Sequence, residues 1–175
     1  MEKLIDEQRD REQDREAAYD AVRKWPQKTA KYAYARAALA GRLAQIKALT
    51  AVRLVAEAEK WARRSHALDP RYRDGAAKRM LGMLYVMAPA ALVRHGDSED
   101  GLEMLEEVLD EYPDNLENHL RVAEAYVGLD DPEPGYELLC TCLSRNKELR
   151  PDSQRLLARL IDSVDQEEMD CPDKR

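Results

Sequence analysis

The feature that most constrains this sequence is a pattern of small and large residues that recurs at a fixed interval. A small residue is followed by apolar or small residues four and seven positions later. The pattern begins at Gly101 and again at Gly135, 34 residues further on, and a weaker copy begins at Ala58, 43 residues before Gly101. Residues spaced by three and four lie on one face of a helix. The recurrence therefore predicts a repeated helical unit.

The composition favours helices throughout. The 175 residues include 7 glycines and no phenylalanine, so the core must come from Leu, Ala, Val, Met and Tyr. Ala and unbranched residues lose little entropy in a helix. No run of alternating β-branched residues is long enough to indicate a strand. We expect an all-α fold of one domain or one short repeat array.

A second pattern precedes each of the later copies. The stretch Leu81-Gly82-x2-Tyr85 comes before one copy, and a looser version ending at Tyr126 comes before the next. The small residue lets two helices cross closely, the tyrosine packs between them, and a proline ends the second helix. The positions that carry both patterns are Ala58, Leu81, Gly82, Tyr85, Gly101, Leu105, Pro113, Tyr126 and Gly135.

These motifs resemble the tetratricopeptide repeat (TPR) family. The resemblance implies three helix pairs over residues 29–150, arranged as a right-handed stack of antiparallel helix pairs. An apolar stripe over residues 151–165 predicts a capping helix for this α-solenoid. Residues 1–28 are expected to form a charged N-terminal helix or arm, and residues 166–175 a disordered acidic tail.

The middle of the chain also resembles a narrower family. A Leu-Gly-x2-Tyr helix that runs into Ala88-Pro89, followed by Gly96-Asp97 before the next helix, is similar to the TRAP-transporter-associated T component. That family is periplasmic and lipid-anchored, so the resemblance implies an accessory subunit that binds a ligand for a transporter. The sequence shows neither its export signal nor its lipidation cysteine. It predicts a cytoplasmic protein as it stands, and a periplasmic one if a signal was removed.

We expect the function to be binding without catalysis. In stacked helix pairs the first helices line the concave face. The candidate groove residues there are Arg79, Met83, Val86, Met87, Leu120, Glu124 and Val127. Methionines suit adaptable apolar recognition. A protein or peptide is therefore the expected partner of this scaffold, and a small apolar ligand is an alternative. The Lys/Asn set with which some TPR proteins hold a C-terminal carboxylate is absent.

Charge is divided unevenly along the chain. Residues 21–73 carry a net charge of +10 and residues 74–175 one of −13. Opposite ends could attract each other between copies, which predicts a homo-oligomer that salt dissociates. Basic and aromatic residues interleave in 21–73, as in proteins that bind single strands. Nucleic acid is nevertheless the less favoured partner, because the whole chain is acidic and these basic residues fall on several faces.

No motif of an enzyme, cofactor or metal site stands out. The sequence contains no nucleophile elbow, HExxH motif or phosphate loop, so we expect no enzyme, no cofactor and no metal. Cys140, Cys142 and Cys171 form a poor disulfide framework, and we interpret them as two partly buried small residues and one tail thiol. No stretch approaches the roughly 20 apolar residues that a transmembrane helix needs.

Overall fold

The computed structural model describes residues 2–7, 9–47 and 50–171, and all regular structure within them is helical. The all-α prediction is therefore confirmed for this part of the chain. The helices are α1 (Glu2–Asp6), α2 (Glu12–Lys24), α3 (Ala30–Ala44), α4 (Ala51–Leu68), α5 (Ala76–Met87), α6 (Ser98–Glu111), α7 (Leu116–Gly128), α8 (Tyr136–Ser144) and α9 (Pro151–Ser163). Short 3₁₀ turns lie at η2 (Ala90–Leu92), η3 (Glu133–Gly135) and η4 (Asn146–Glu148).

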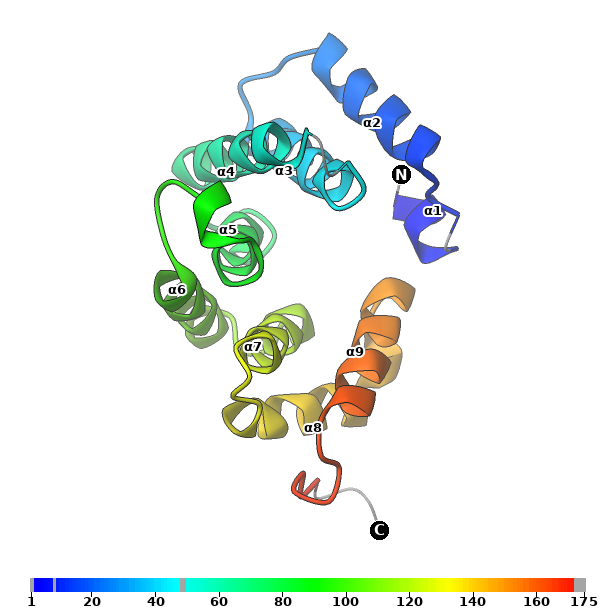
Figure 1. Ribbon diagram of the computed structural model, residues 1–175, viewed down its shortest axis with the longest axis vertical. Helices are drawn as coiled ribbons and strands as arrows, with labels where there is room; N and C mark the ends of the chain where they lie inside the picture. Colours follow the sequence, from blue (N-terminus) through cyan, green and yellow to red (C-terminus); the bar gives the residue numbers. More distant parts are fainter. Residues whose placement is uncertain (1, 8, 48–49, 172–175) are drawn as a thin grey trace.

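The helices follow one another around a curve (Figure 1). From α2 to α9, each packs against the helix that comes next in the sequence, and α5 also packs against α7. In Figure 1, α5 and α7 lie nearer the middle of the curve, and α4, α6 and α8 lie nearer its outside. The two ends meet, because α1 packs against α9 and Arg155 donates a hydrogen bond of 2.9 Å to the Ile5 carbonyl.

Small residues lie where successive helices cross. A Cβ placed on Gly82 in α5 would lie 2.7 Å from the carbonyl oxygen of Gly101 in α6, and a Cβ on Gly101 would lie 2.7 Å from the Gly82 carbonyl oxygen. The two backbones are therefore in direct contact. Gly135 lies against Ala123 in the next pair in the same way. Gly41 of α3 likewise lies next to Ala58 of α4, although less closely, because a Cβ on Gly41 would lie 3.9 Å from the Cβ of Ala58.

The N-terminal arm is two helices, α1 and α2, where we had expected one helix or an arm. Polar contacts join the arm to α3 and to the turn after it. Asp10 forms ion pairs with Arg15 and Arg42, both at 2.9 Å, and Lys47 pairs with Glu12 and Glu16 of α2. Tyr19 is buried and packs with Leu43 of α3 and Leu54 of α4. The charged arm is therefore anchored to α3, α4 and the turn between them by an apolar contact region and by ion pairs.

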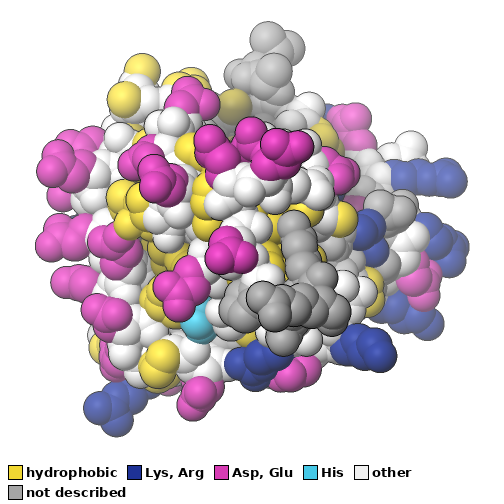
Figure 2. All heavy atoms as spheres, turned by 90° about the horizontal axis from the view of Figure 1, so that it is seen from below, with side chains coloured by type: hydrophobic (Ala, Val, Ile, Leu, Met, Phe, Trp, Pro, Cys, Tyr) yellow, Lys and Arg dark blue, Asp and Glu magenta, His cyan; other side chains and the backbone are white. Residues whose placement is uncertain are grey.

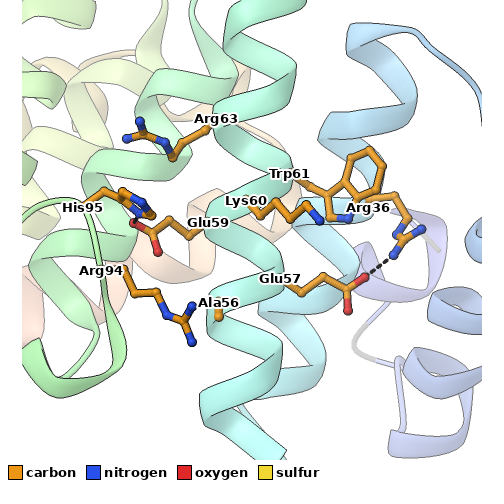
Figure 3. A pocket seen from close by; sticks show the side chains of 9 residues that line it. All are labelled: Arg36, Ala56, Glu57, Glu59, Lys60, Trp61, Arg63, Arg94 and His95. Carbon is orange, nitrogen blue, oxygen red and sulfur yellow. Dashed lines mark hydrogen bonds and ion pairs between the residues drawn. The ribbon is translucent and has the colours of Figure 1, made fainter.

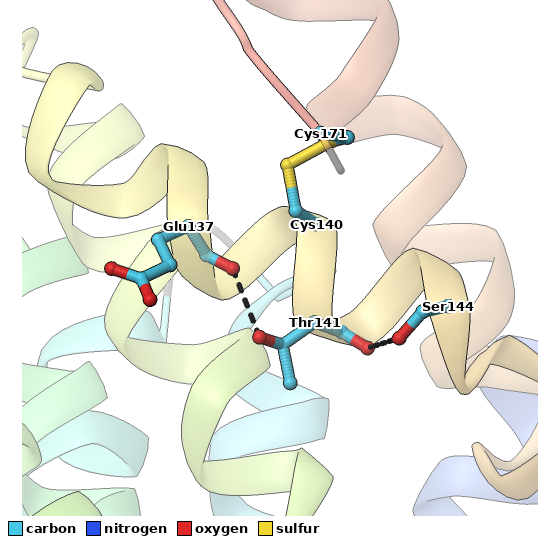
Figure 4. The surroundings of a disulfide bond; sticks show 5 residues. All are labelled: Glu137, Cys140, Thr141, Ser144 and Cys171. Carbon is cyan, nitrogen blue, oxygen red and sulfur yellow. Dashed lines mark hydrogen bonds between the residues drawn. A yellow bond between two sulfur atoms is a disulfide. The ribbon is translucent and has the colours of Figure 1, made fainter. Parts of the chain in front are cut away.

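The C-terminal segment is packed, so the predicted disordered tail is wrong for residues 166–171. Met169 is 2% exposed and belongs to the core cluster of α7, α8 and α9. Cys171 forms a disulfide with Cys140 of α8 (Figure 4). Our interpretation of three unpaired cysteines is therefore also wrong. Cys142 is buried and free, because residues two apart on a helix point to different faces. Residues 172–175 lie outside the described residues.

Candidate binding site

The apolar centre of the predicted groove is covered. Leu120 is 0% exposed and belongs to the core between α7, α8 and α9, so the predicted role in partner contact is wrong for this residue. Met83 and Val86 are partly buried against Leu105 and Val122. The physical reason is that α7 packs against α5, α8 and α9, which buries side chains that a wider stack would leave open.

Two further apolar residues of the predicted groove lie at the end of this interface. Met87 is 53% exposed, and its sulfur lies 2.9 Å from the place of a Cβ on Gly128 at the end of α7. Val127 is partly buried against the C-terminal core. Of the apolar residues in the predicted set, Met87 is therefore the most exposed, whereas Met83, Val86 and Val127 are partly buried.

Polar side chains instead connect α5, α7 and α9. Arg79 of α5 donates to the amide oxygen of Asn118 in α7. Arg121 of α7 pairs with Glu124 at 2.6 Å and with Glu117 at 3.7 Å. The Ser153 hydroxyl of α9 donates to Glu117. We call this set the inner polar belt, which consists of Arg79, Glu117, Asn118, Arg121, Glu124 and Ser153.

The two arginines of the belt differ in how their charge is balanced. Burial works against the charge of Arg121, but its pairs with Glu124 and Glu117 outweigh burial and raise the pKa. Burial lowers the pKa of Arg79, and the like charges of Arg121 and Arg73 lower it further, against the opposing effects of Tyr34 and Glu117. Arg121 is thus held by carboxylates of its own helix, whereas the charge of Arg79 is poorly compensated.

The partners of Arg79 are neutral. Besides the Asn118 amide, its guanidinium lies 3.4 Å from the backbone carbonyl of Asp74. Among the described residues, no carboxylate lies within ion-pair distance of Arg79. Glu117 pairs with Arg121 instead and accepts a hydrogen bond from Ser153. A partly desolvated cation without a counter-charge is unfavourable, and an acidic group from outside would relieve it.

A separate pocket of about 580 Å³ lies on α4, away from the belt (Figure 3). Its edge is formed by the segment between α5 and α6. Beneath it, Glu59 is only 1% exposed, accepts a hydrogen bond of 3.0 Å from the Tyr85 hydroxyl and lies 2.9 Å from Nδ1 of His95. The buried carboxylate thus ties α4 to the tyrosine of α5 and to the loop that follows.

The sequence matches no model of a known protein family and no curated protein. Within the described ranges, no group of side chains is placed to hold a metal ion, and no helix is long and apolar enough to cross a membrane.

The inner-facing positions inferred from the sequence include Arg79, Glu117 and Glu124 of the belt but not Asn118, Arg121 or Ser153. A signal existed for Arg121, because Glu117, Arg121 and Glu124 are spaced by four and three, as ion pairs on one helix face are. No feature of the neighbouring sequence indicates that Ser153 belongs to the belt or that Glu59 lies beneath a pocket. The residues that these two side chains contact are 26 to 36 positions away in the sequence.

Proposed function

We propose that this protein is a non-catalytic binding protein of the TPR type, in which antiparallel helix pairs form a right-handed stack. Small residues at the helix crossings of successive pairs support this proposal, as Gly82 with Gly101 and Ala123 with Gly135 repeat one contact. The partner is a protein segment that binds along the inner polar belt. The observation that carries the proposal is the guanidinium of Arg79, which has only neutral acceptors.

The chemistry of the belt specifies the partner segment. A carboxylate that reaches Arg79 forms a charge-assisted hydrogen bond, which is stronger than the bond to the neutral Asn118 amide. Glu124, which pairs with Arg121, is a second polar side chain of the belt and lies six residues after Asn118 on α7. An extended peptide with an acidic residue therefore fits better than the small apolar ligand that the sequence left open.

A peptide selection on the intact protein tests this proposal. We expect selected peptides to contain an acidic residue, and Arg79→Gln to weaken the binding of a selected peptide at least ~10-fold in fluorescence anisotropy, or about 1.4 kcal/mol. Arg64→Gln removes the same charge from an exposed position on α4 and serves as the control. Equal affinity of wild type and Arg79→Gln would show that the partner does not contact the belt. Thermal unfolding of each variant verifies that it is folded.

The Cys140–Cys171 disulfide favours a second candidate, a periplasmic accessory subunit of a TRAP-type transporter. Disulfides persist in oxidising compartments and are rare in the cytoplasm. This candidate predicts that both cysteines resist alkylation when cells are quenched with acid and labelled without a reductant. Labelling of Cys140 and Cys171 under those conditions would count against the periplasmic location but not against peptide binding.

A further inference from the structure

The pocket on α4 is lined by more positive than negative side chains. Four of them are basic: Arg36 from α3, Lys60 and Arg63 from α4, and Arg94 from the loop after α5. Its two carboxylates belong to α4. With His95 neutral, the formal charge of the lining is therefore +2. In Figure 3 these side chains are arranged around α4, with Lys60 directed toward Trp61 and Arg36 and with Arg63 and Arg94 on the side of His95.

Contacts inside the protein already occupy both carboxylates and one of the cations. Glu57 pairs with Arg36 and accepts a hydrogen bond of 2.6 Å from the Tyr19 hydroxyl. Arg36 also lies over the ring of Trp61, 4.7 Å from its centroid. Glu59 is buried beneath the pocket, as described above. These groups form the wall and floor of the pocket. Their charges and hydrogen-bonding atoms already interact with other protein groups, so they are not the groups that would bind a ligand.

Three cations remain directed at solvent. Lys60, Arg63 and Arg94 are exposed, and in the described part of the chain none of them has an ion pair with a carboxylate. These three side chains come from two segments about 30 positions apart in the sequence, and only the tertiary structure brings them together.

The loop that carries Arg94 is held in place. The next residue, His95, lies 2.9 Å from the buried Glu59 carboxylate. Gly96 then passes directly under the ring of Tyr85, where a Cβ would lie 2.5 Å from the nearest ring atom, so no larger residue fits. Arg94 therefore faces α4 from a fixed position, which lowers the entropic cost of using it to bind a ligand.

We propose that this pocket binds a phosphoryl group, either as free phosphate or on a small molecule, through Lys60, Arg63 and Arg94. Cations on several sides suit a tetrahedral oxyanion with charge on each oxygen, and arginine offers paired donors that match phosphate geometry. The site is distinct from the inner polar belt, since it lies on α4 and shares no residue with the belt. It goes beyond the proposed peptide binding and does not depend on it.

Calorimetric titration of the full-length protein at low ionic strength tests the site. The probes are inorganic phosphate, phosphoserine and, as a carboxylate of similar charge, succinate. We expect saturable binding of at least one phosphate probe at one site per chain, stronger than succinate. Tighter binding of inorganic phosphate identifies the free ion as the ligand, and tighter binding of phosphoserine identifies an organic phosphate.

Charge-matched variants separate this site from a merely cationic surface. Lys60→Gln combined with Arg94→Gln should weaken phosphate binding at least ~10-fold, because charge-assisted hydrogen bonds from both sides are lost. The control, Arg53→Gln with Arg64→Gln, removes two exposed charges of α4 outside the pocket and should change affinity less than ~2-fold. Equal weakening by both pairs, preference for succinate, or no binding of either phosphate probe would overturn the proposal. Arg79→Gln should leave phosphate binding intact, whatever its effect on peptides.

Discussion

Gly82 is the residue at which the close crossing of α5 and α6 can be tested most directly. A Cβ there would lie 2.7 Å from both the Gly101 carbonyl oxygen and Cγ of Leu105, so the helices would have to separate. We expect Gly82→Ala to lower the free energy of unfolding by about 1–3 kcal/mol, as overpacking of a close contact does. Urea denaturation followed by circular dichroism measures this change.

Gly41 provides a matched control in α3. A Cβ there would lie 3.9 Å from the nearest heavy atom, the Cβ of Ala58, which is an ordinary contact. Gly41→Ala should therefore stabilise the protein by about 0.5–1 kcal/mol, because alanine loses less entropy in a helix. If Gly82→Ala were as stable as Gly41→Ala, the backbone contact between α5 and α6 would not exist in solution.

Glu57 makes stability depend on pH in the acid range. Burial tends to raise the pKa of Glu57, but hydrogen bonds from Tyr19 and Arg36 outweigh it, and the pKa lies below its ordinary value of 4.5. The folded state therefore releases this proton more readily than the unfolded state. The stabilisation is complete above about pH 4.5 and is lost as the pH falls through the lowered pKa.

Replacing this carboxylate should flatten that dependence. We expect Glu57→Gln to lower stability at pH 7 by about 1–2 kcal/mol, as loss of hydrogen bonds to a charged group does, with a smaller loss below pH 4. Glu103→Gln, at an exposed position of α6, is the control. Urea midpoints measured between pH 3 and pH 7 give the comparison, and parallel profiles for wild type and Glu57→Gln would contradict this assignment.

At the scale of elements, the disulfide holds the segment after α9 against α8. Cys140 and Cys171 are separated by 31 positions, and Met169 between them is buried in the core. Closing a loop of this length restricts the unfolded chain, and such disulfides contribute about 2–4 kcal/mol. We expect Cys140→Ser with Cys171→Ser to lower stability by that amount and to make residues 164–171 sensitive to limited proteolysis.

Cys142, two residues from Cys140, is the internal control for thiol chemistry. Burial raises the pKa of its thiol to about 12, so the reactive thiolate is scarce at neutral pH. We expect iodoacetamide at pH 8 to leave the native oxidised protein unlabelled and to add one label after unfolding without a reductant. Mass spectrometry distinguishes these cases. Labelling of the native protein would show that α8 does not bury Cys142.

For the whole molecule, the contact between α1 and α9 closes the curve of helices. Ile5 of α1 is buried, whereas Lys3 in the same helix is exposed. We expect Ile5→Asp to abolish hydrogen-exchange protection in α1, because a buried unpaired charge is costly, and Lys3→Asp to leave it unchanged. Both variants should leave protection of α5 and α6 intact. Equal protection of α1 in the two variants would show that this contact does not form in solution.

The surface charge is also divided in space. On the face seen from the side of α8, acidic side chains cover much of the surface and basic ones lie at its margins (Figure 2). The exposed acidic residues of α8 and its flanking segments include Glu133, Glu137 and Glu148, and those of the segment after α9 include Asp165, Glu167, Glu168 and Asp170. Self-association through opposite charges stays a prediction. Sedimentation at about 20 mM and 300 mM salt tests it, because salt screens attraction between exposed charges and should dissociate an oligomer held by them. A monomer at both concentrations would contradict it.

Local features of this protein were readable from the sequence. The composition predicted an all-α fold, which the described residues confirm, and Gly96-Asp97 was expected to come just before a helix. Asp97 caps α6, where its side chain accepts hydrogen bonds from the backbone of Glu99 and Asp100. These features depend on residues a few positions apart. Helix periodicity and capping involve only such neighbours, so a single sequence contains the information that specifies them.

Only the tertiary structure decided which surfaces are open. Leu120 had the spacing of a groove residue, yet it is buried because α7 packs against neighbours on several sides. Glu59 meets His95 36 residues later in the sequence, and Cys140 meets Cys171 31 residues later. Contacts between distant segments depend on how closely helices approach and at what angle, which periodicity along one helix does not specify.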